Sequence, residues 1–121
     1  MALVDPDQLK LLKKQKYRNK PFRDVSGLYW ASQREYDRWR ELKLFEQGGS
    51  IRKLQRQVRY PFVINKVKIG WYVADFVYKI HPNACTPWKT VVEDSKGFKT
   101  DVYKMKKKLM KAIYGIDIKE V

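Results

Sequence analysis

The chain has 121 residues and a mass of 14.5 kDa, a length that fits one compact domain. Its hydrophobic residues (44%) and aromatic residues (14%) exclude intrinsic disorder of the whole chain. One cysteine and one histidine exclude an internal disulfide and a cysteine-rich or paired-histidine metal site, so any metal must be bound by oxygen. No apolar run reaches the roughly 18 residues of a membrane span, and no signal peptide is evident. We expect an intracellular protein.

Positive charge dominates the chain: 27 Lys and Arg against 13 Asp and Glu give +14 at pH 7. Such an excess destabilises a small folded protein by self-repulsion unless a polyanion neutralises it, so nucleic acid is the expected partner. An anionic membrane is the alternative partner. No segment has a strongly apolar face on one side and a lysine-rich face on the other, so we expect no membrane partner. Between Gln47 and Val92 the only acidic residue is Asp75. This isolated carboxylate needs an explanation.

The N-terminal part is basic and differs in character from the rest. We expect a basic arm or helix over residues 1–26 and a folded domain over residues 27–121. Asp5 followed by Pro6 is typical of a helix start. Residues 16–24 are polar, basic and interrupted by proline, which predicts a loop.

A capping box begins the first helix of the folded domain. Ser32 and Glu35 have the Ser-x-x-Glu spacing, in which the glutamate bonds back to the first backbone N–H of the helix. The apolar residues that follow recur at helical spacing until Gly48 ends the pattern. The residues alone leave open whether Glu35 serves as a helix cap or as part of a functional site.

Three strands are predicted after this helix. In residues 51–64 apolar side chains lie among arginines, with Pro61 within the segment, which predicts a strand that bends or lies at a sheet edge. Residues 71–80 form a clear strand with period-two alternation, and residues 88–95 form its antiparallel neighbour.

A second helix and a short strand complete the chain. Thr100 is the predicted N-cap, and Gly115 ends the helix. Its expected apolar stripe consists of Val102, Met105, Leu109, Ala112 and Ile113. Residues 116–118 are the expected last strand. The order helix, three strands, helix, strand predicts an α/β (α+β) fold with a mixed sheet flanked by helices.

A charged constellation follows from the strands. Asp94 and Lys96 are two residues apart and project to one face, whereas Glu93 and Ser95 project to the other. If this strand pairs with that of Asp75, one face carries two carboxylates and an ammonium group. Mg²⁺ relieves the repulsion between two such carboxylates, and a metal-bound water beside a lysine is suited to attack on a phosphodiester. Because Asp-x-Lys is also common by chance, a purely structural role stays open.

Four segments, 30–35, 61–64, 74–76 and 92–97, together resemble the PD-(D/E)xK nucleases, whose restriction-endonuclease-like core has the order αβββαβ. The similarity is greatest to small phage endonucleases of that fold and extends more distantly to phage endonuclease I type Holliday-junction resolvases. It covers residues 27–118. The resemblance implies a Mg²⁺- or Mn²⁺-dependent DNA endonuclease, selective for branched or double-stranded DNA and active in the host cytoplasm if phage-encoded.

The resemblance also implies residue roles. Asp75 would be the main metal ligand, Asp94 the second, and the Ser95 backbone carbonyl a third. Lys96 matches the lysine that positions or activates the attacking water. Glu35 matches a helical glutamate that such nucleases add to the metal site. The implied catalytic set is therefore Glu35, Asp75, Asp94 and Lys96.

Three further positions refine the comparison. Gln57 matches a glutamine near the site in similar phage proteins. Ala74 stands where the motif that names the family has proline. Glu93 is a second acidic residue at the end of the same strand, but alternation points it away from Lys96 and favours Asp94.

Basic residues line the segments beside this constellation. The candidate DNA contacts are Arg52, Lys53, Arg56, Arg59, Lys99, Lys104, Lys107, Lys108 and Lys111. A solvated helix face is the alternative for the lysines, but the net charge favours phosphate contacts. A non-catalytic nucleic-acid-binding protein on the same fold is the alternative function. Because a four-way junction offers two symmetric strands, we expect a homodimer.

Overall fold

A computed structural model describes residues 20–83, 85–95 and 99–121. The chain divides into two compact units, Met1–Asp37 and Arg38–Val121, which are described separately. The predicted arm lies mostly outside the described residues, and the expected boundary between residues 26 and 27 stays a prediction. Neither helix in the described ranges combines the length and the apolar character that crossing a membrane requires.

In the first unit, two short strands, β1 (Phe22–Arg23) and β2 (Tyr29–Trp30), pair in antiparallel fashion. The loop predicted for residues 16–24 is therefore wrong at Phe22 and Arg23, whereas Asp24 lies outside the strand and stabilises the turn that follows. Its Oδ1 accepts hydrogen bonds from the backbone N–H groups of Ser26 (2.9 Å) and Leu28 (3.1 Å). These bonds stabilise the turn, although the sequence here lacks the residue pattern of a regular β-turn.

The predicted first helix is confirmed as α2 (Gln33–Gln47), which begins in the first unit and continues in the second. The Ser32 hydroxyl accepts the backbone N–H of Glu35 at 3.1 Å, as a capping residue does. The helix ends at Gly48 and Gly49, and the latter has a φ of 82°. This left-handed conformation costs glycine little and stops the helix.

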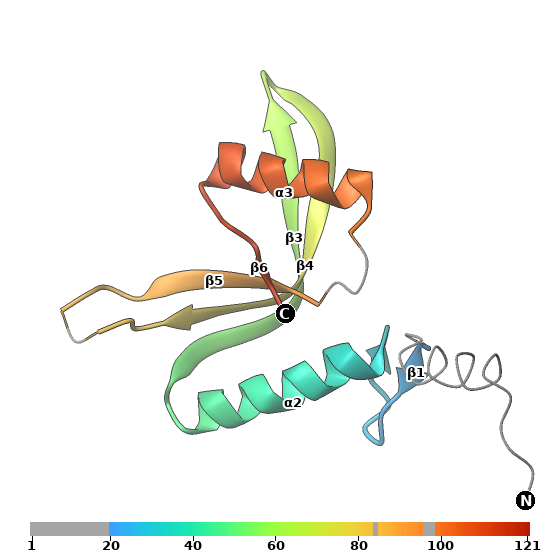
Figure 1. The fold of residues 1–121 in the computed structure, drawn as a ribbon, viewed down its shortest axis with the longest axis vertical. Coiled ribbons are helices and arrows are strands. Elements are labelled where there is room, and N and C mark those ends of the chain that lie inside the picture. The colour runs from blue at the N-terminus through green and yellow to red at the C-terminus, as the bar shows by residue number, and fades with distance from the viewer. Residues whose placement is uncertain (1–19, 84, 96–98) are drawn as a thin grey trace, which may run out of the picture. The chain divides into compact units, whose positions relative to one another are not determined.

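The second unit is built on a four-stranded mixed sheet of order β3-β4-β5-β6 (Figure 1). The strands are β3 (Ile51–Ile64), β4 (Val67–Ile80), β5 (Lys89–Asp94) and β6 (Lys119–Glu120). The pairs β3–β4 and β4–β5 are antiparallel, and β5–β6 is parallel. The predicted order helix, three strands, helix, strand is confirmed, and β3 with Pro61 lies at the sheet edge as expected.

A tight hairpin turn joins β3 to β4. Asn65 and Lys66 have φ values of 50° and 66°, the two positive angles of a type I′ turn. Because the second position is lysine rather than glycine, the sequence carries no strong signal for this turn. The strand expected from residue 71 therefore begins earlier, at Val67.

The second helix, α3 (Asp101–Tyr114), has the predicted caps. The Thr100 hydroxyl accepts the Tyr103 backbone N–H at 3.1 Å, and Gly115 is left-handed with a φ of 68°. The predicted apolar stripe is partly wrong: Val102 and Met105 are exposed, whereas Tyr103 and Met110 are buried. The helix turns these two larger side chains towards the sheet, where they fill more of the core.

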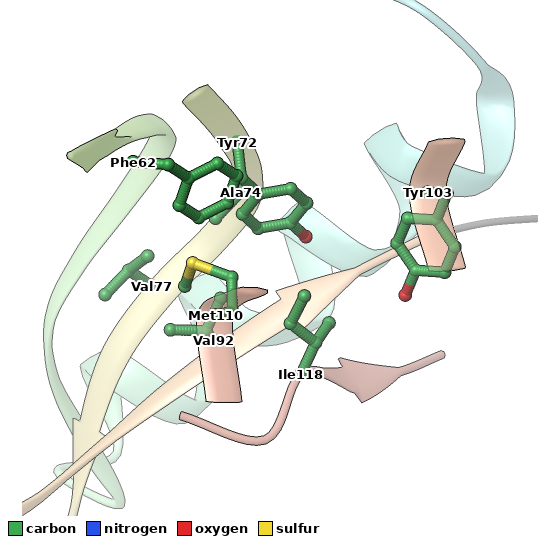
Figure 2. Close-up of a cluster of buried hydrophobic side chains, with 8 residues drawn as sticks. All are labelled: Phe62, Tyr72, Ala74, Val77, Val92, Tyr103, Met110 and Ile118. Carbon is green, nitrogen blue, oxygen red and sulfur yellow. The ribbon is translucent and has the colours of Figure 1, made fainter. Parts of the chain in front are cut away.

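The core of the second unit lies between α3 and the sheet (Figure 2). It consists of Phe62, Tyr72, Ala74, Val77, Val92, Tyr103, Met110 and Ile118. Ile118 immediately precedes β6, which begins at Lys119 rather than at the predicted residue 116. Trp71, for which the apolar pattern predicts burial, is exposed, whereas Trp30, for which the pattern was undecided, is buried.

Candidate active site

The register between β4 and β5 brings the two expected aspartates together. Phe76 of β4 pairs with Glu93 of β5 at the end of this register, and Asp75 and Asp94 are the residues next to that pair. The backbone N–H of Ser95, next to Asp94, donates to Asp75 Oδ2, and the charges of both aspartates act on Tyr72 and Tyr103. Asp75 and Asp94 therefore lie near each other at this end of the sheet.

Two of the other expected residues contact Asp75 directly. The Ser95 backbone N–H donates to Asp75 Oδ2 at 2.8 Å, and Gln57 Nε2 donates to Asp75 Oδ1 at 3.5 Å. Gln57 has a φ of 52° within β3, a conformation that few residues other than glycine, asparagine and aspartate adopt readily. The residue that reaches Asp75 thus departs from extended strand geometry.

Asp94 is more deeply buried than Asp75, with 1% of its surface exposed. The Tyr72 hydroxyl donates to Asp94 Oδ2 at 2.5 Å. Burial and this hydrogen bond raise the pKa of Tyr72 well above its ordinary value, so Tyr72 remains a donor. The bond compensates part of the cost of burying the carboxylate.

A second buried tyrosine, Tyr103 of α3, also responds to the carboxylates. Burial raises its pKa most, followed by the charges of Asp94, Glu120 and Asp75. The charges of both Asp94 and Asp75 also raise the pKa of Tyr72. Two phenol groups of the core (Figure 2) thus lie within the field of both carboxylates, which makes this end of the sheet a concentrated acidic site in a basic protein.

Glu93 lies on the opposite face from Asp94 and is fully buried. Arg38 of α2 binds it through two hydrogen bonds, from Nε at 2.8 Å and from Nη2 at 2.7 Å, and the Tyr78 hydroxyl also donates to it. The hydrogen bond to Glu93 raises the pKa of Arg38 further above its ordinary value. Glu93 is therefore committed to an ion pair, which leaves Asp94 as the acid that faces Asp75.

The remaining members of the expected set are placed differently. Lys96 lies outside the described residues. Glu35 belongs to the first unit, where its side chain is 4% exposed and its backbone N–H is capped by Ser32. Its role as a metal ligand, and that of the Ser95 carbonyl, stay predictions. Within the described ranges, no cluster of three or more His, Cys, Asp or Glu side chains is arranged to bind a metal.

A family model matches residues 14–120, which is nearly the whole chain. The chain belongs to this family. It is described as a protein of unknown function, DUF1064. No curated protein matches the chain, and no solved structure does. The DUF1064 match includes both aspartates, Gln57 and the segment around Lys96.

The arginines of β3 that were expected to contact DNA in this DUF1064 chain each lie over a tryptophan ring. The pairs, with the distance from guanidinium carbon to ring centroid, are Arg52–Trp88 at 4.2 Å, Arg56–Trp39 at 5.8 Å and Arg59–Trp71 at 5.1 Å. Such cation–π contacts orient a guanidinium group while its edge can still donate hydrogen bonds. The arginines are therefore held in position along the edge strand.

The expected DNA-binding lysines fall into two groups. Lys99 and Lys107 both pair with Glu120, and Lys111 pairs with Asp117 at 2.8 Å. Lys53, Lys104 and Lys108 are exposed. The charge of the first group is partly neutralised within the protein, whereas the second group projects its charge into solvent.

The sequence pattern did not single out the two tyrosines of the site. Alternation along the strand assigns Tyr72 to the core. Helical spacing leaves Tyr103 beside the expected apolar stripe. A tyrosine at a buried position usually has a partner for its hydroxyl group. That rule, applied to Tyr72 three residues before Asp75, is the signal that points to the site.

Proposed function

We propose that this protein is a divalent-metal-dependent DNA endonuclease that hydrolyses phosphodiester bonds, with a preference for branched DNA. The observation that carries the proposal is the proximity of Asp75 and Asp94 at the ends of neighbouring strands, in a chain of net charge +14. The strand and helix order agrees with the core expected from the PD-(D/E)xK resemblance. We further propose a homodimer that acts inside the cell.

The chemistry of the donor set suits Mg²⁺ or Mn²⁺, which prefer carboxylate and carbonyl oxygens. Asp75 and Asp94 would hold the ion, with the Ser95 carbonyl and Glu35 as proposed further ligands. When bound, the ion would act as a Lewis acid towards the phosphodiester and generate a nucleophile from water at neutral pH.

The chain's own groups orient these carboxylates. The Ser95 N–H and the Gln57 amide fix the two oxygens of Asp75, and Tyr72 fixes one oxygen of Asp94. Lys96 is the proposed group that positions the attacking water. The exposed lysines and the arginines of β3 would bind phosphates and so align the DNA.

The test compares Asp75→Asn with the parent and with Asp117→Asn, a matched change at an exposed aspartate. Labelled duplex, single-stranded, flapped and four-way DNA are incubated with Mg²⁺, Mn²⁺ or a chelator. We expect the parent and Asp117→Asn to cleave only with the ions, and Asp75→Asn to bind DNA at least as tightly without cleaving. Equal cleavage by Asp75→Asn would remove this residue from catalysis.

A non-catalytic nucleic-acid-binding protein is the second candidate. It is supported by the net charge of +14 and by the arginines of β3 held over tryptophan rings, which can contact phosphates without a metal. This alternative replaces the first if no DNA form is cleaved with any divalent ion while DNA is bound. A mass measurement that gives only monomer, with and without DNA, would count against the proposed homodimer.

A further inference from the structure

The end of the β3–β4 hairpin, here called the hairpin tip and defined as residues 59–71, has an unusual surface. Five large apolar side chains on it are each at least 43% exposed, namely Val63, Ile64, Val67, Ile69 and Trp71. The tip projects beyond α3 (Figure 1). A cluster of exposed apolar side chains indicates a contact surface, whereas single apolar residues scattered over a surface do not.

One face of the hairpin is covered by α3. The Tyr60 and Tyr114 rings lie edge to face at 5.3 Å between centroids, and the Tyr114 hydroxyl donates to the Pro61 carbonyl at 2.5 Å. Phe62 is buried on this side. Because Trp71 pairs with Pro61, next to Phe62 and its partner Gly70, alternation places Trp71 on the other face.

Two cations flank the exposed Trp71 ring. The Arg59 guanidinium carbon lies 5.1 Å and Lys68 Nζ lies 5.3 Å from the ring centroid. These two cation–π contacts hold the indole ring in place and leave 43% of Trp71 exposed. A fixed aromatic surface bordered by cations is the arrangement that binds a nucleobase between its phosphates.

The charge of the tip decides between partners. It contains Arg59, Lys66 and Lys68 and no acidic residue. A two-fold contact between copies would use the same patch twice and would bring two sets of these cations into one interface, with no acidic residue of the tip to pair them. A nucleic acid with unpaired bases can pair its phosphates with these cations and cover the apolar side chains with its base faces.

We propose that the hairpin tip binds DNA with open base faces, at a single-stranded segment or a branch point. Trp71 stacks on an unpaired base, the apolar residues at the turn cover its neighbour, and Arg59 and Lys68 contact the flanking phosphates. The inference shares a nucleic-acid partner with the proposed function, but it requires neither a metal nor cleavage.

The experiment measures binding in a chelator, so that no cleavage occurs, by fluorescence anisotropy with single-stranded, four-way and fully paired DNA. The variant is Trp71→Ala, and Phe45→Ala is the matched control because Phe45 is an aromatic of α2 with similar exposure, 42%. Stacking of one base predicts that Trp71→Ala binds the first two DNAs about ten- to a hundredfold more weakly. Paired DNA should change much less, and Trp71→Phe should retain most of the affinity. Circular dichroism verifies the fold of each variant.

Several outcomes would overturn the inference. Equal affinities of Trp71→Ala and the parent would do so, and so would an equal loss on paired and open DNA. If the parent sediments as a dimer and Trp71→Ala as a monomer, the tip is a surface between copies instead. Val67→Ser provides a second variant at the turn and should also weaken binding to open DNA selectively.

The two proposals fail separately. Loss of open-DNA binding in Trp71→Ala, with no cleavage of any DNA by the parent, would refute the endonuclease and leave the tip assignment intact. Metal-dependent cleavage that requires Asp75, with unchanged binding by Trp71→Ala, would refute the tip assignment alone.

Discussion

Tyr72 and Asp94 are joined by a 2.5 Å hydrogen bond from the phenol hydroxyl to carboxylate Oδ2, and both side chains are buried. The bond links the middle of β4 to the end of β5. A buried carboxylate needs donors to remain ionised, because desolvation otherwise favours its protonated form. Tyr72 therefore helps to keep Asp94 charged and oriented near Asp75.

We expect Tyr72→Phe to lower the free energy of unfolding by about 1–3 kcal/mol, because a buried charged acceptor loses a donor. Urea unfolding at neutral pH measures the change. Tyr60→Phe is the control, since Tyr60 is only partly buried and contacts Tyr114 through its ring. In a double-mutant cycle with Asp94→Asn, the two effects should be non-additive by at least about 0.5 kcal/mol. Additive effects would mean that the bond contributes nothing.

The Arg38–Glu93 pair provides a second prediction. Glu93 is fully buried and Arg38 is 17% exposed, so removing the cation leaves an uncompensated charge in the protein interior. We expect Arg38→Met to destabilise the fold by about 3–5 kcal/mol. Glu41→Gln removes only the exposed partner of Arg38 and should cost less than about 1 kcal/mol. Similar losses in the two variants would contradict the assigned role of Glu93.

Alternation in a strand has a fixed period of two, and it separates Glu93 from Asp94: Glu93 binds Arg38 and Asp94 binds Tyr72. Along β4 it predicts the faces only in part, because Ala74 and Val77, three residues apart, belong to the same core cluster. The choice of Asp94 over Glu93 as a metal ligand stays a prediction. The caps of α3 were predictable because Thr100 and Gly115 act through their own side chain and backbone.

Features set by tertiary packing were not predictable in this way. Helical spacing admits more than one apolar stripe on α3, and packing against the sheet decides that Tyr103 and Met110, rather than Val102 and Met105, are buried. Trp71 is exposed because it lies on the hairpin face away from α3, and the strand pattern does not say which face a helix covers. The turn at Asn65 and Lys66 lacks glycine and thus its usual signal.

The lysines of α3 should differ in their contribution to DNA binding. Each phosphate contact contributes about 0.9 to the slope of log affinity against log salt concentration. Lys104→Ala and Lys108→Ala should each reduce the slope by about one. Lys107→Ala and Lys111→Ala should change it less, because Glu120 and Asp117 already neutralise these charges. Salt titrations of binding to one duplex measure the slopes, and equal slopes in all four variants would refute the distinction.

Tyrosines whose pKa is raised by burial make the fold sensitive to alkali, and three of them hold or adjoin buried carboxylates. Burial is the main cause that raises the pKa of Tyr72, Tyr78 and Tyr103 above the ordinary 10.0. Their contribution to stability is complete below pH 10.0 and is lost as the pH rises towards the raised values, because the unfolded chain releases these protons first. Tyrosinate absorbance should show late-titrating groups in the folded protein that titrate normally in urea, with one fewer in Tyr72→Phe. Ionisation of every tyrosine near the ordinary pKa in the folded protein would contradict this.

Asp24 gives the first unit the opposite dependence on pH. The Ser26 hydroxyl and the Trp30 indole Nε1–H, at 2.5 and 2.8 Å, lower its pKa from 3.8 to about 2. A lowered pKa means that the carboxylate stabilises the turn fully above pH 3.8, and that this stabilisation is lost as the pH falls through about 2. The Nε1–H resonance of Trp30 in an acid titration should therefore move with a midpoint near 2. A midpoint at the ordinary 3.8 would show that the bonds to the carboxylate are not formed in solution, whereas Asp24→Asn should remove the transition altogether.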